Sequence, residues 1–106
     1  VGGTWYWNRY PGARFDSESY SYQYSFSQEL IEEWSWSEKF AGQPEIERYL
    51  NFVADKFDLR KHIQFDSRIE HVHFYEAARE WTVETAAGEK ARARFVICAT
   101  GLLSAT

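Results

Sequence analysis

The 106-residue sequence contains no methionine, one cysteine and two prolines. A single cysteine, Cys98, excludes a disulfide within the chain and is typical of a reducing compartment, so we expect a cytoplasmic protein. No apolar run approaches the roughly 18 residues that a membrane-spanning helix needs. Basic charge is also scarce, with a net charge of −4. The sequence therefore argues against nucleic acid or an anionic membrane as the main partner, because both are bound through Lys and Arg.

Aromatic residues are plentiful, at 19% of the chain. Five of them lie between Gly2 and Asp16, in the stretch GGTWYWNRYPGARFD. The two glycines at its start permit positive φ and close approach of the backbone to a ligand. Trp and Tyr offer flat faces with polar groups, and Pro11-Gly12 indicates a turn. This composition favours a planar, partly polar ligand, with packing of the same rings in a core as the alternative.

Residues 1–27 show no sustained period, and we expect an extended aromatic loop. The alternating Tyr20, Tyr22, Tyr24 and Phe26 are also compatible with a short strand.

Residues 28–61 are predicted to form two helices. The first is expected from about Ser27 to Trp36, with Ser25 or Ser27 as the cap. The second has Pro44 in its first turn and Arg60 and Lys61 in its last. Its apolar face repeats at helical spacing and comprises Ile46, Tyr49, Leu50, Val53 and Phe57.

Residues 62–101 are predicted to be strands. A short strand is expected at Ile63 to Phe65, followed by an antiparallel meander over about 68–75, 81–85 and 90–94. The continuously apolar run Phe95 to Ala99 is typical of a strand buried on both faces. It leads into Thr100-Gly101, at the end of a strand where ligands sit in open α/β sheets.

One spacing in this sequence is similar to a known signature. Gly2-Gly3-x-Trp5, Tyr10-Pro11-Gly12 and Asp16 match, position for position, the pattern of the Baeyer-Villiger monooxygenases: a small residue, Gly, any residue, Trp, four residues, Phe or Tyr, Pro, Gly or Met, three residues, Asp. The resemblance continues through three further segments and so covers nearly the whole chain: Tyr22 to Phe26, Gln43 to Ile46, and Ala99 to Gly101.

The resemblance implies an α/β fold: part of an FAD-binding Rossmann-like domain, interrupted by a three-stranded antiparallel β-meander. The chain has no Gly-x-Gly-x-x-Gly sequence, which the family carries in its first βαβ unit. We therefore expect a segment of a longer polypeptide, with that motif and the catalytic arginine supplied by the remainder.

The activity implied is that of an FAD- and NADPH-dependent monooxygenase. In this family NADPH reduces FAD, the reduced flavin activates O2, and one oxygen atom is inserted beside a ketone carbonyl to give an ester or lactone. Two alternatives remain open. One is an N- or S-oxygenating flavin monooxygenase. The other is a non-catalytic, aromatic-rich module that binds carbohydrate or peptide.

The resemblance also assigns roles to individual residues. Asp16 would be catalytic, lying near flavin and nicotinamide and orienting the arginine; a turn or cap residue is the simpler interpretation. The other residues would contact the cofactors. Thr4, Trp5, Tyr6 and Trp7 would contact the flavin, and Arg14 and Phe15 the nicotinamide end of NADP. Tyr22 would lie on the ribityl or phosphate side of the flavin, and the backbone of Ile69 would contact the adenine of FAD. Tyr22 is almost as typical of a core aromatic.

Three other groups of residues are candidate sites. His71 and His73 form a His-x-His pair, but no third ligand has a supporting spacing, so solvent-facing strand histidines are favoured and no metal is expected. Cys98 is interpreted as a small core residue rather than a nucleophile. Glu29, Glu32 and Glu33 are interpreted as a solvated helix face.

Overall fold

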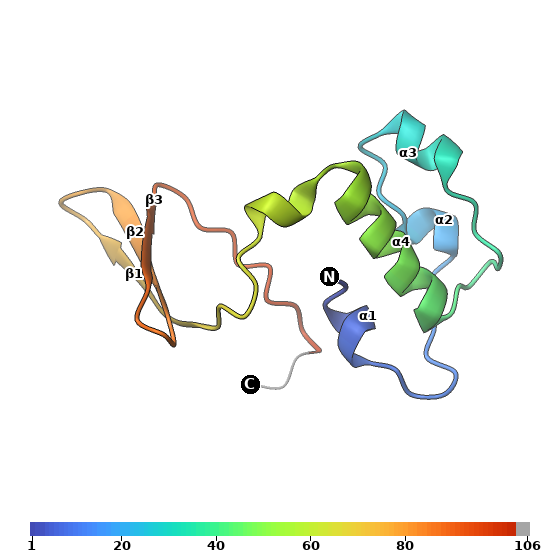
Figure 1. Cartoon of the computed structure of the whole chain (residues 1–106), viewed down its shortest axis with the longest axis horizontal. Helices are drawn as coiled ribbons and strands as arrows, with labels where there is room; N and C mark the ends of the chain where they lie inside the picture. Colours follow the sequence, from blue (N-terminus) through green and yellow to red (C-terminus); the bar gives the residue numbers. More distant parts are fainter. Residues whose placement is uncertain (104–106) are drawn as a thin grey trace. The chain divides into compact units, whose positions relative to one another are not determined.

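The structure, a computed structural model, describes residues 1–103. The chain divides into two compact units, residues 1–61 together with Leu103, and residues 62–102. The α-helices belong to the first unit and the β-strands to the second (Figure 1).

The first unit contains the helices α1 (Thr4–Trp7), α2 (Ser19–Tyr22), α3 (Gln28–Glu33) and α4 (Gln43–Lys56). The expected loop over residues 1–27 thus includes two short helices. A strand through its alternating aromatics is wrong, because the backbone N–H of Tyr22 donates to the Glu18 carbonyl and closes a helical turn.

The helix α3 begins where its capping residue predicts. The Ser27 Oγ accepts a hydrogen bond from the Leu30 N–H at 3.2 Å, and Leu30 is buried. The helix ends at Glu33 rather than near Trp36, because Trp34 has extended backbone angles, φ −100 and ψ 125. The Trp34 ring then packs on Tyr49 of α4, 5.2 Å between ring centroids.

The helix α4 begins at Gly42 as N-cap, with a proline in its first turn as predicted. Ile46, Tyr49 and Val53 are buried, whereas Leu50 is only half-buried. Arg60 and Lys61 do not lie in its last turn: they belong to the separate 3-10 helix η1 (Leu59–His62). The helix ends earlier than expected because Asp58 takes a positive φ of 49°.

The core of this unit consists of two small groups of buried side chains. Phe15, Ala41 and Ile46 form one, and Leu30, Tyr49 and Val53 form the other. The half-buried Trp36 and Leu50 pack against both groups and join them. Burial raises the pKa of the Tyr49 phenol, whose oxygen accepts a hydrogen bond from the Tyr24 N–H at 2.8 Å.

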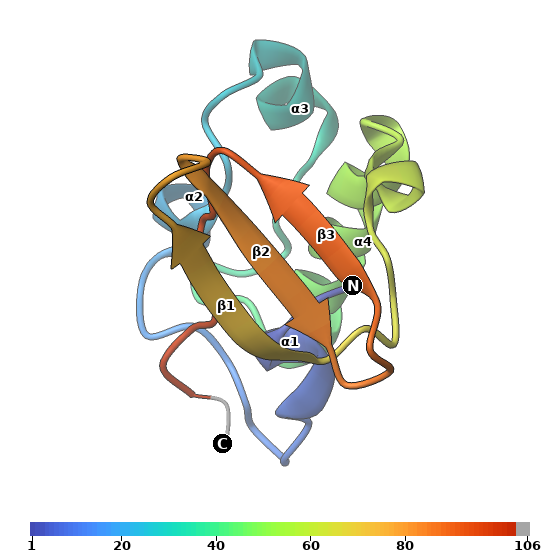
Figure 2. The ribbon, with the colours of Figure 1, turned by 90° about the vertical axis from the view of Figure 1, so that its left-hand side faces the viewer.

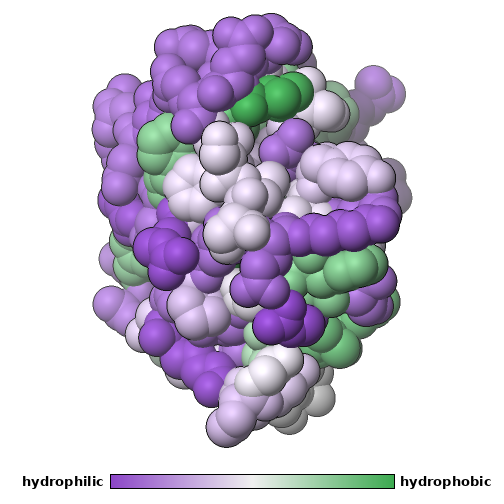
Figure 3. Space-filling view, turned by 90° about the vertical axis from the view of Figure 1, so that its right-hand side faces the viewer, coloured by the Kyte–Doolittle hydropathy of each residue, from purple (hydrophilic) through white to green (hydrophobic). Residues whose placement is uncertain are grey.

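On the surface, hydrophilic residues make up much of the face in Figure 3, with pale and hydrophobic areas between them.

The second unit is a three-stranded antiparallel sheet in the order β1 (Ile69–Tyr75), β2 (Glu80–Thr85), β3 (Lys90–Ala93), as predicted (Figure 2). Residues paired across it share a face. Val72, Val83 and Ala91 align on one face, as do Phe74, Trp81 and Ala93. The opposite face is polar and carries the rows His71, Glu84, Lys90 and His73, Thr82, Arg92.

Two predicted strands are absent from the described residues. Ile63 to Phe65 and Phe95 to Ala99 have no strand structure, and Phe95 and Ile97 are 80% and 91% exposed. A strand buried on both faces needs neighbours to pair with, and residues 1–103 supply no parallel strand beside it. For the same reason Cys98 is exposed rather than a core residue. None of the described helices has both the length and the apolar character required to cross a bilayer.

Candidate functional site

The signature begins with two glycines that start the short helix α1. Gly2 and Gly3 have φ angles of 135° and 51°, which residues other than glycine rarely adopt. A Cβ on Gly2 would also lie only 3.2 Å from the Tyr6 Cβ. The glycines therefore allow α1 to form where it does, leaving Tyr6 and Trp7 45% and 77% exposed.

A tight turn follows α1. The Ala13 N–H donates to the Tyr10 carbonyl at 3.1 Å, with Pro11 second in the turn and Gly12 third at φ 83°, the geometry of a type II turn. The turn reverses the chain, so that the residues after it lie beside the start of α4. There the Gln43 N–H donates to the Ala13 carbonyl at 2.8 Å.

Three of the predicted site residues meet in one aromatic cluster. The Trp5 indole donates from Nε1 to the Tyr22 Oη at 3.1 Å. Phe15 lies edge-on to Trp5 at 5.4 Å and beside Tyr22 at 4.0 Å between centroids. Phe15 is 4% exposed and Tyr22 46%. The Phe15 ring thus supports the cluster from within, while Tyr22 keeps part of its ring accessible.

The two charged candidates next to this cluster differ in their surroundings. Asp16 is exposed, at a bend directly after Phe15. The Arg14 guanidinium is turned towards the loop before α4, where Nη1 lies 3.0 Å from Glu38 Oε2 and donates to the Phe40 carbonyl at 2.7 Å. The fold therefore leaves the Asp16 carboxylate facing solvent and holds the Arg14 head group with groups of this chain.

The remaining candidates belong to the sheet. Ile69 opens β1 opposite Thr85 and is half exposed. His71 and His73 are both exposed. Within residues 1–103 no three His, Cys, Asp or Glu side chains come together in a way that could hold a metal ion.

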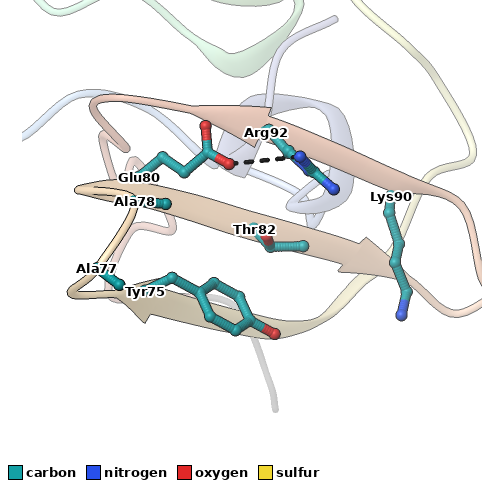
Figure 4. A pocket seen from close by; sticks show the side chains of 7 residues that line it. All are labelled: Tyr75, Ala77, Ala78, Glu80, Thr82, Lys90 and Arg92. Carbon is teal, nitrogen blue, oxygen red and sulfur yellow. Dashed lines mark ion pairs between the residues drawn. The ribbon is translucent and has the colours of Figure 1, made fainter.

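A shallow hollow of about 660 Å³ lies on the polar face of the sheet (Figure 4). Its charged side chains are paired: Arg92 Nη1 is 3.6 Å from Glu80 Oε1, and Lys90 Nζ is 3.3 Å from Glu84. The two charges within each pair neutralise each other, so the hollow has no unpaired charge with which to select an ion. None of the predicted site residues lines it.

Sequence reasoning missed two buried polar residues that hold the signature in place. Gln43 is 6% exposed, and its Nε2 donates to the Trp5 carbonyl and to Glu47 Oε2. Ser19 is 1% exposed and binds the loop before α4. The Gln-Pro sequence at the start of α4 is a signal that could have identified Gln43. No sequence signal distinguishes Ser19, because it is one of several serines in a Ser- and Tyr-rich run.

The surroundings of Gly3 have room for a planar group, whereas the start of α4 is unsuited to a phosphate. No atom lies within 4 Å of a Cβ built on Gly3, and exposed rings stand next to it. Phosphates, by contrast, need free backbone N–H groups at a helix N-terminus. At the start of α4 the Gln43 N–H already binds the Ala13 carbonyl, and Pro44 has no N–H.

No family model matches the chain. It is 56% identical over 105 residues to the acetone monooxygenase (methyl acetate-forming) of Gordonia sp. (strain TY-5), covering 99% of this chain and 20% of that protein. It is 48% identical over 106 residues to a Baeyer-Villiger monooxygenase of Pseudooceanicola batsensis, with 100% and 19% covered. It is 47% identical over 104 residues to a phenazine N-monooxygenase of Lysobacter antibioticus, with 98% and 19% covered.

Solved structures of monooxygenases also match this chain. An oxidized steroid monooxygenase bound to NADP matches with a TM-score of 0.95 and 58% identity, over 98% of this chain and 20% of that one. The OTEMO complex with FAD and NADP matches with a TM-score of 0.91 and 52% identity, over 100% and 20%. The resemblance to Baeyer-Villiger monooxygenases is thus confirmed, and the chain spans about a fifth of the length of these relatives.

Proposed function

We propose that this chain is part of the Rossmann-like FAD-binding domain of a cytoplasmic monooxygenase that uses FAD, NADPH and O2 to convert ketones into esters or lactones. The observation that carries the proposal is the near-complete match at 56% identity to an acetone monooxygenase. Two features of the chain support it further. Every position of the Trp, Tyr-Pro-Gly and Asp signature is present, and the glycines and turn of that signature adjoin one aromatic cluster.

In this proposal the segment Thr4 to Trp7 lies against the flavin ring. FAD, when bound, supplies electron transfer from NADPH and activation of O2. The protein contributes position and exclusion of water. The Trp5–Tyr22 hydrogen bond and the Gln43 bond to the Trp5 carbonyl hold α1 so that Tyr6 and Trp7 present their exposed faces, while Tyr22 lies towards the ribityl side.

Asp16 is the proposed catalytic residue of this chain, orienting an arginine from the remainder of the polypeptide. Its exposed carboxylate is accessible to such a partner, and its neighbour Phe15 is anchored in the core. Arg14 and Phe15 would adjoin NADP at its nicotinamide end, and the backbone of Ile69 the adenine of FAD. Since the Phe15 ring is buried, its contact would be made by the backbone.

The test uses the full-length protein. Purified enzyme would be given NADPH, 18O2 and a panel of linear and cyclic ketones, and the products analysed by mass spectrometry. The expected result is ketone-dependent NADPH oxidation with one 18O atom in each ester or lactone. If every ketone gave one hydrogen peroxide, formed by reduction of O2, for each NADPH oxidised, and no labelled product, the proposal would be contradicted.

N-oxygenation is the second candidate, favoured by the 47% identity to a phenazine N-monooxygenase. The same assay separates the two, with a heteroaromatic amine in place of the ketone. A labelled N-oxide without any labelled ester would favour this alternative.

A further inference from the structure

The loop that carries Asp16 is bound at both ends to one neighbouring segment, the loop before α4. On one side the Phe15 N–H donates to the Ala41 carbonyl at 3.1 Å, and on the other the Ser19 N–H donates to the Lys39 carbonyl at 2.7 Å. Asp16 to Glu18 therefore span two fixed points, and the direction of the Asp16 side chain depends on both.

The side chain of Ser19 adds hydrogen bonds to this second fixed point. Its Oγ accepts a hydrogen bond from the Ala41 N–H at 2.9 Å, and its hydroxyl hydrogen faces the Glu38 and Lys39 carbonyls at 2.9 and 3.1 Å. Ser19 is 1% and Ala41 0% exposed, so water cannot replace this hydroxyl. Without it, the Ala41 N–H would be left buried and unpaired, which is costly.

Other contacts between the two segments are nearer the surface. Glu18 pairs with Lys39 at 2.7 Å and Arg14 with Glu38 at 3.0 Å, but the two basic side chains are 65% and 47% exposed. Exposed ion pairs hold a backbone weakly because water screens them and both side chains lose freedom. The Ser19 hydroxyl is thus the buried side-chain link that fixes the far end of the Asp16 loop.

We propose that Ser19 is a positioning residue for Asp16: its hydroxyl fixes residues 16–18 so that the carboxylate presents one direction to its partner. The inference rests on the proposed function, in which Asp16 orients an arginine. A charged group that must be aligned to within about half an ångström depends on supporting hydrogen bonds of this kind.

The test compares Ser19→Ala with Ser21→Ala in the full-length holoenzyme. Ser21 lies in the same helix α2 but is exposed, so its variant controls for loss of a hydroxyl as such. We expect Ser19→Ala to retain FAD, to lower kcat for ketone oxygenation by about tenfold to a hundredfold, and to release more hydrogen peroxide per NADPH. The KM for the ketone should change little, and Ser21→Ala should match the wild type in every readout.

Two further measurements separate positioning from general weakening of the fold. In an Asp16→Ala background, Ser19→Ala should lower kcat little further, because both act through one interaction. Hydrogen exchange of the holoenzyme should be faster for peptides covering residues 15–19 and 38–41 in Ser19→Ala, and unchanged in Ser21→Ala. If Ser19→Ala does not fold, Ser19→Cys, which keeps a weak donor and acceptor, is measured instead and should show the same losses in milder form.

Wild-type kcat and coupling in the Ser19 variant, or independent effects of the two substitutions, would overturn the inference while leaving the proposed function intact. A wild-type enzyme that oxygenates no ketone would instead refute the proposed function, and the role of Ser19 with it.

Discussion

Asp16 combines a free side chain with a constrained backbone. Its carboxylate faces solvent, yet the preceding residue, Phe15, is 4% exposed and packs against Trp5, Tyr22 and Trp36. A carboxylate that must meet a partner from elsewhere benefits from both properties, because the entropy of aligning it is lost during folding rather than during catalysis.

Replacing Asp16 with Ala in the full-length enzyme should leave FAD bound, because no ring or phosphate contact is removed. Oxygenation should fall by about a hundredfold or more, the usual effect of losing one preorganised electrostatic group. NADPH oxidation should continue in part and yield hydrogen peroxide. Flavin absorbance, product formation and peroxide release measure the three effects. Loss of FAD together with unfolding would show that Asp16 is a structural turn residue.

Gly12 should be needed for its conformation alone. Its φ is 83°, and no atom lies within 4 Å of a Cβ built there, so Gly12→Ala should cost about 1–2 kcal/mol from backbone strain without any clash. Gly12→Asn should cost less, because Asn tolerates positive φ. Urea unfolding of both variants measures the difference. Equal stability of wild type and Gly12→Ala would mean that the turn is not of type II.

Local chemistry explains which of these residues could be predicted. The turn at Pro11-Gly12 follows from the two residue types themselves, and the N-cap at Ser27 from a serine before an apolar helical pattern. Ser19 and Gln43 owe their importance to partners about twenty or more positions away, at Glu38, Ala41 and Trp5. Such contacts arise from the tertiary fold and leave no periodic pattern in the sequence.

The helix α4 connects the signature with the core, since its first turn binds Ala13 and Trp5 and its buried face holds Ile46. Ile46 is 0% exposed, so Ile46→Ala should cost about 2–5 kcal/mol. Leu50→Ala should cost less because Leu50 is half-buried, and Arg48→Ala, on the exposed side of the same helix, should be nearly neutral. Denaturant titration of the three variants gives the order, which a larger loss at Leu50 than at Ile46 would contradict.

The helices α3 and α4 are also joined by a small group of charges. Lys56 Nζ lies 3.0 Å from Glu29 Oε1 and 2.9 Å from Glu33 Oε2. The hydrogen bond from Lys56 lowers the pKa of Glu29 below its ordinary value. Hydrogen bonds to Glu33 and then Glu29 raise the pKa of Lys56.

These shifts predict a pH dependence with two limits. The Glu29 contribution to stability is present above its ordinary pKa of 4.5 and is lost as the pH falls through the lowered folded value. The Lys56 contribution is present below 10.5 and is lost as the pH rises through the raised folded value. Lys56→Gln should therefore lower Tm at neutral pH and flatten its decline at both extremes. An unchanged Tm profile would show that the charges are fully screened.

The strands show the same division between local and distant causes. Alternation of apolar and polar residues fixes the two faces of β1 and β2, so the meander could be predicted from sequence. The run Phe95 to Ala99 is apolar throughout, a pattern suited to a strand between two others. Residues 1–103 provide no such neighbouring strands. The apolar pattern of Phe95 to Ala99 therefore suits a packing environment that is absent from the described residues.

The residues of this chain supply only part of the proposed cofactor site. Exposed rings and positive-φ glycines suit the flavin ring, whereas the chain has no Gly-x-Gly-x-x-Gly sequence. The relatives are about five times as long. In the proposed enzyme, the phosphate site and the arginine partner of Asp16 therefore come from the remainder of the polypeptide.

The 106 residues alone should consequently bind FAD weakly. The pyrophosphate of a dinucleotide binds at a helix N-terminus after a glycine-rich turn, and at the start of α4 the Gln43 N–H is already bonded to the Ala13 carbonyl. Ring stacking without that contact should leave Kd weaker than micromolar, less than about 8 kcal/mol of binding free energy. Quenching of FAD fluorescence measures it, with circular dichroism as the control that the helices have formed. Micromolar or tighter binding by the folded chain would mean that these residues hold the phosphates without a glycine-rich loop, and that the division of the cofactor site proposed here is wrong.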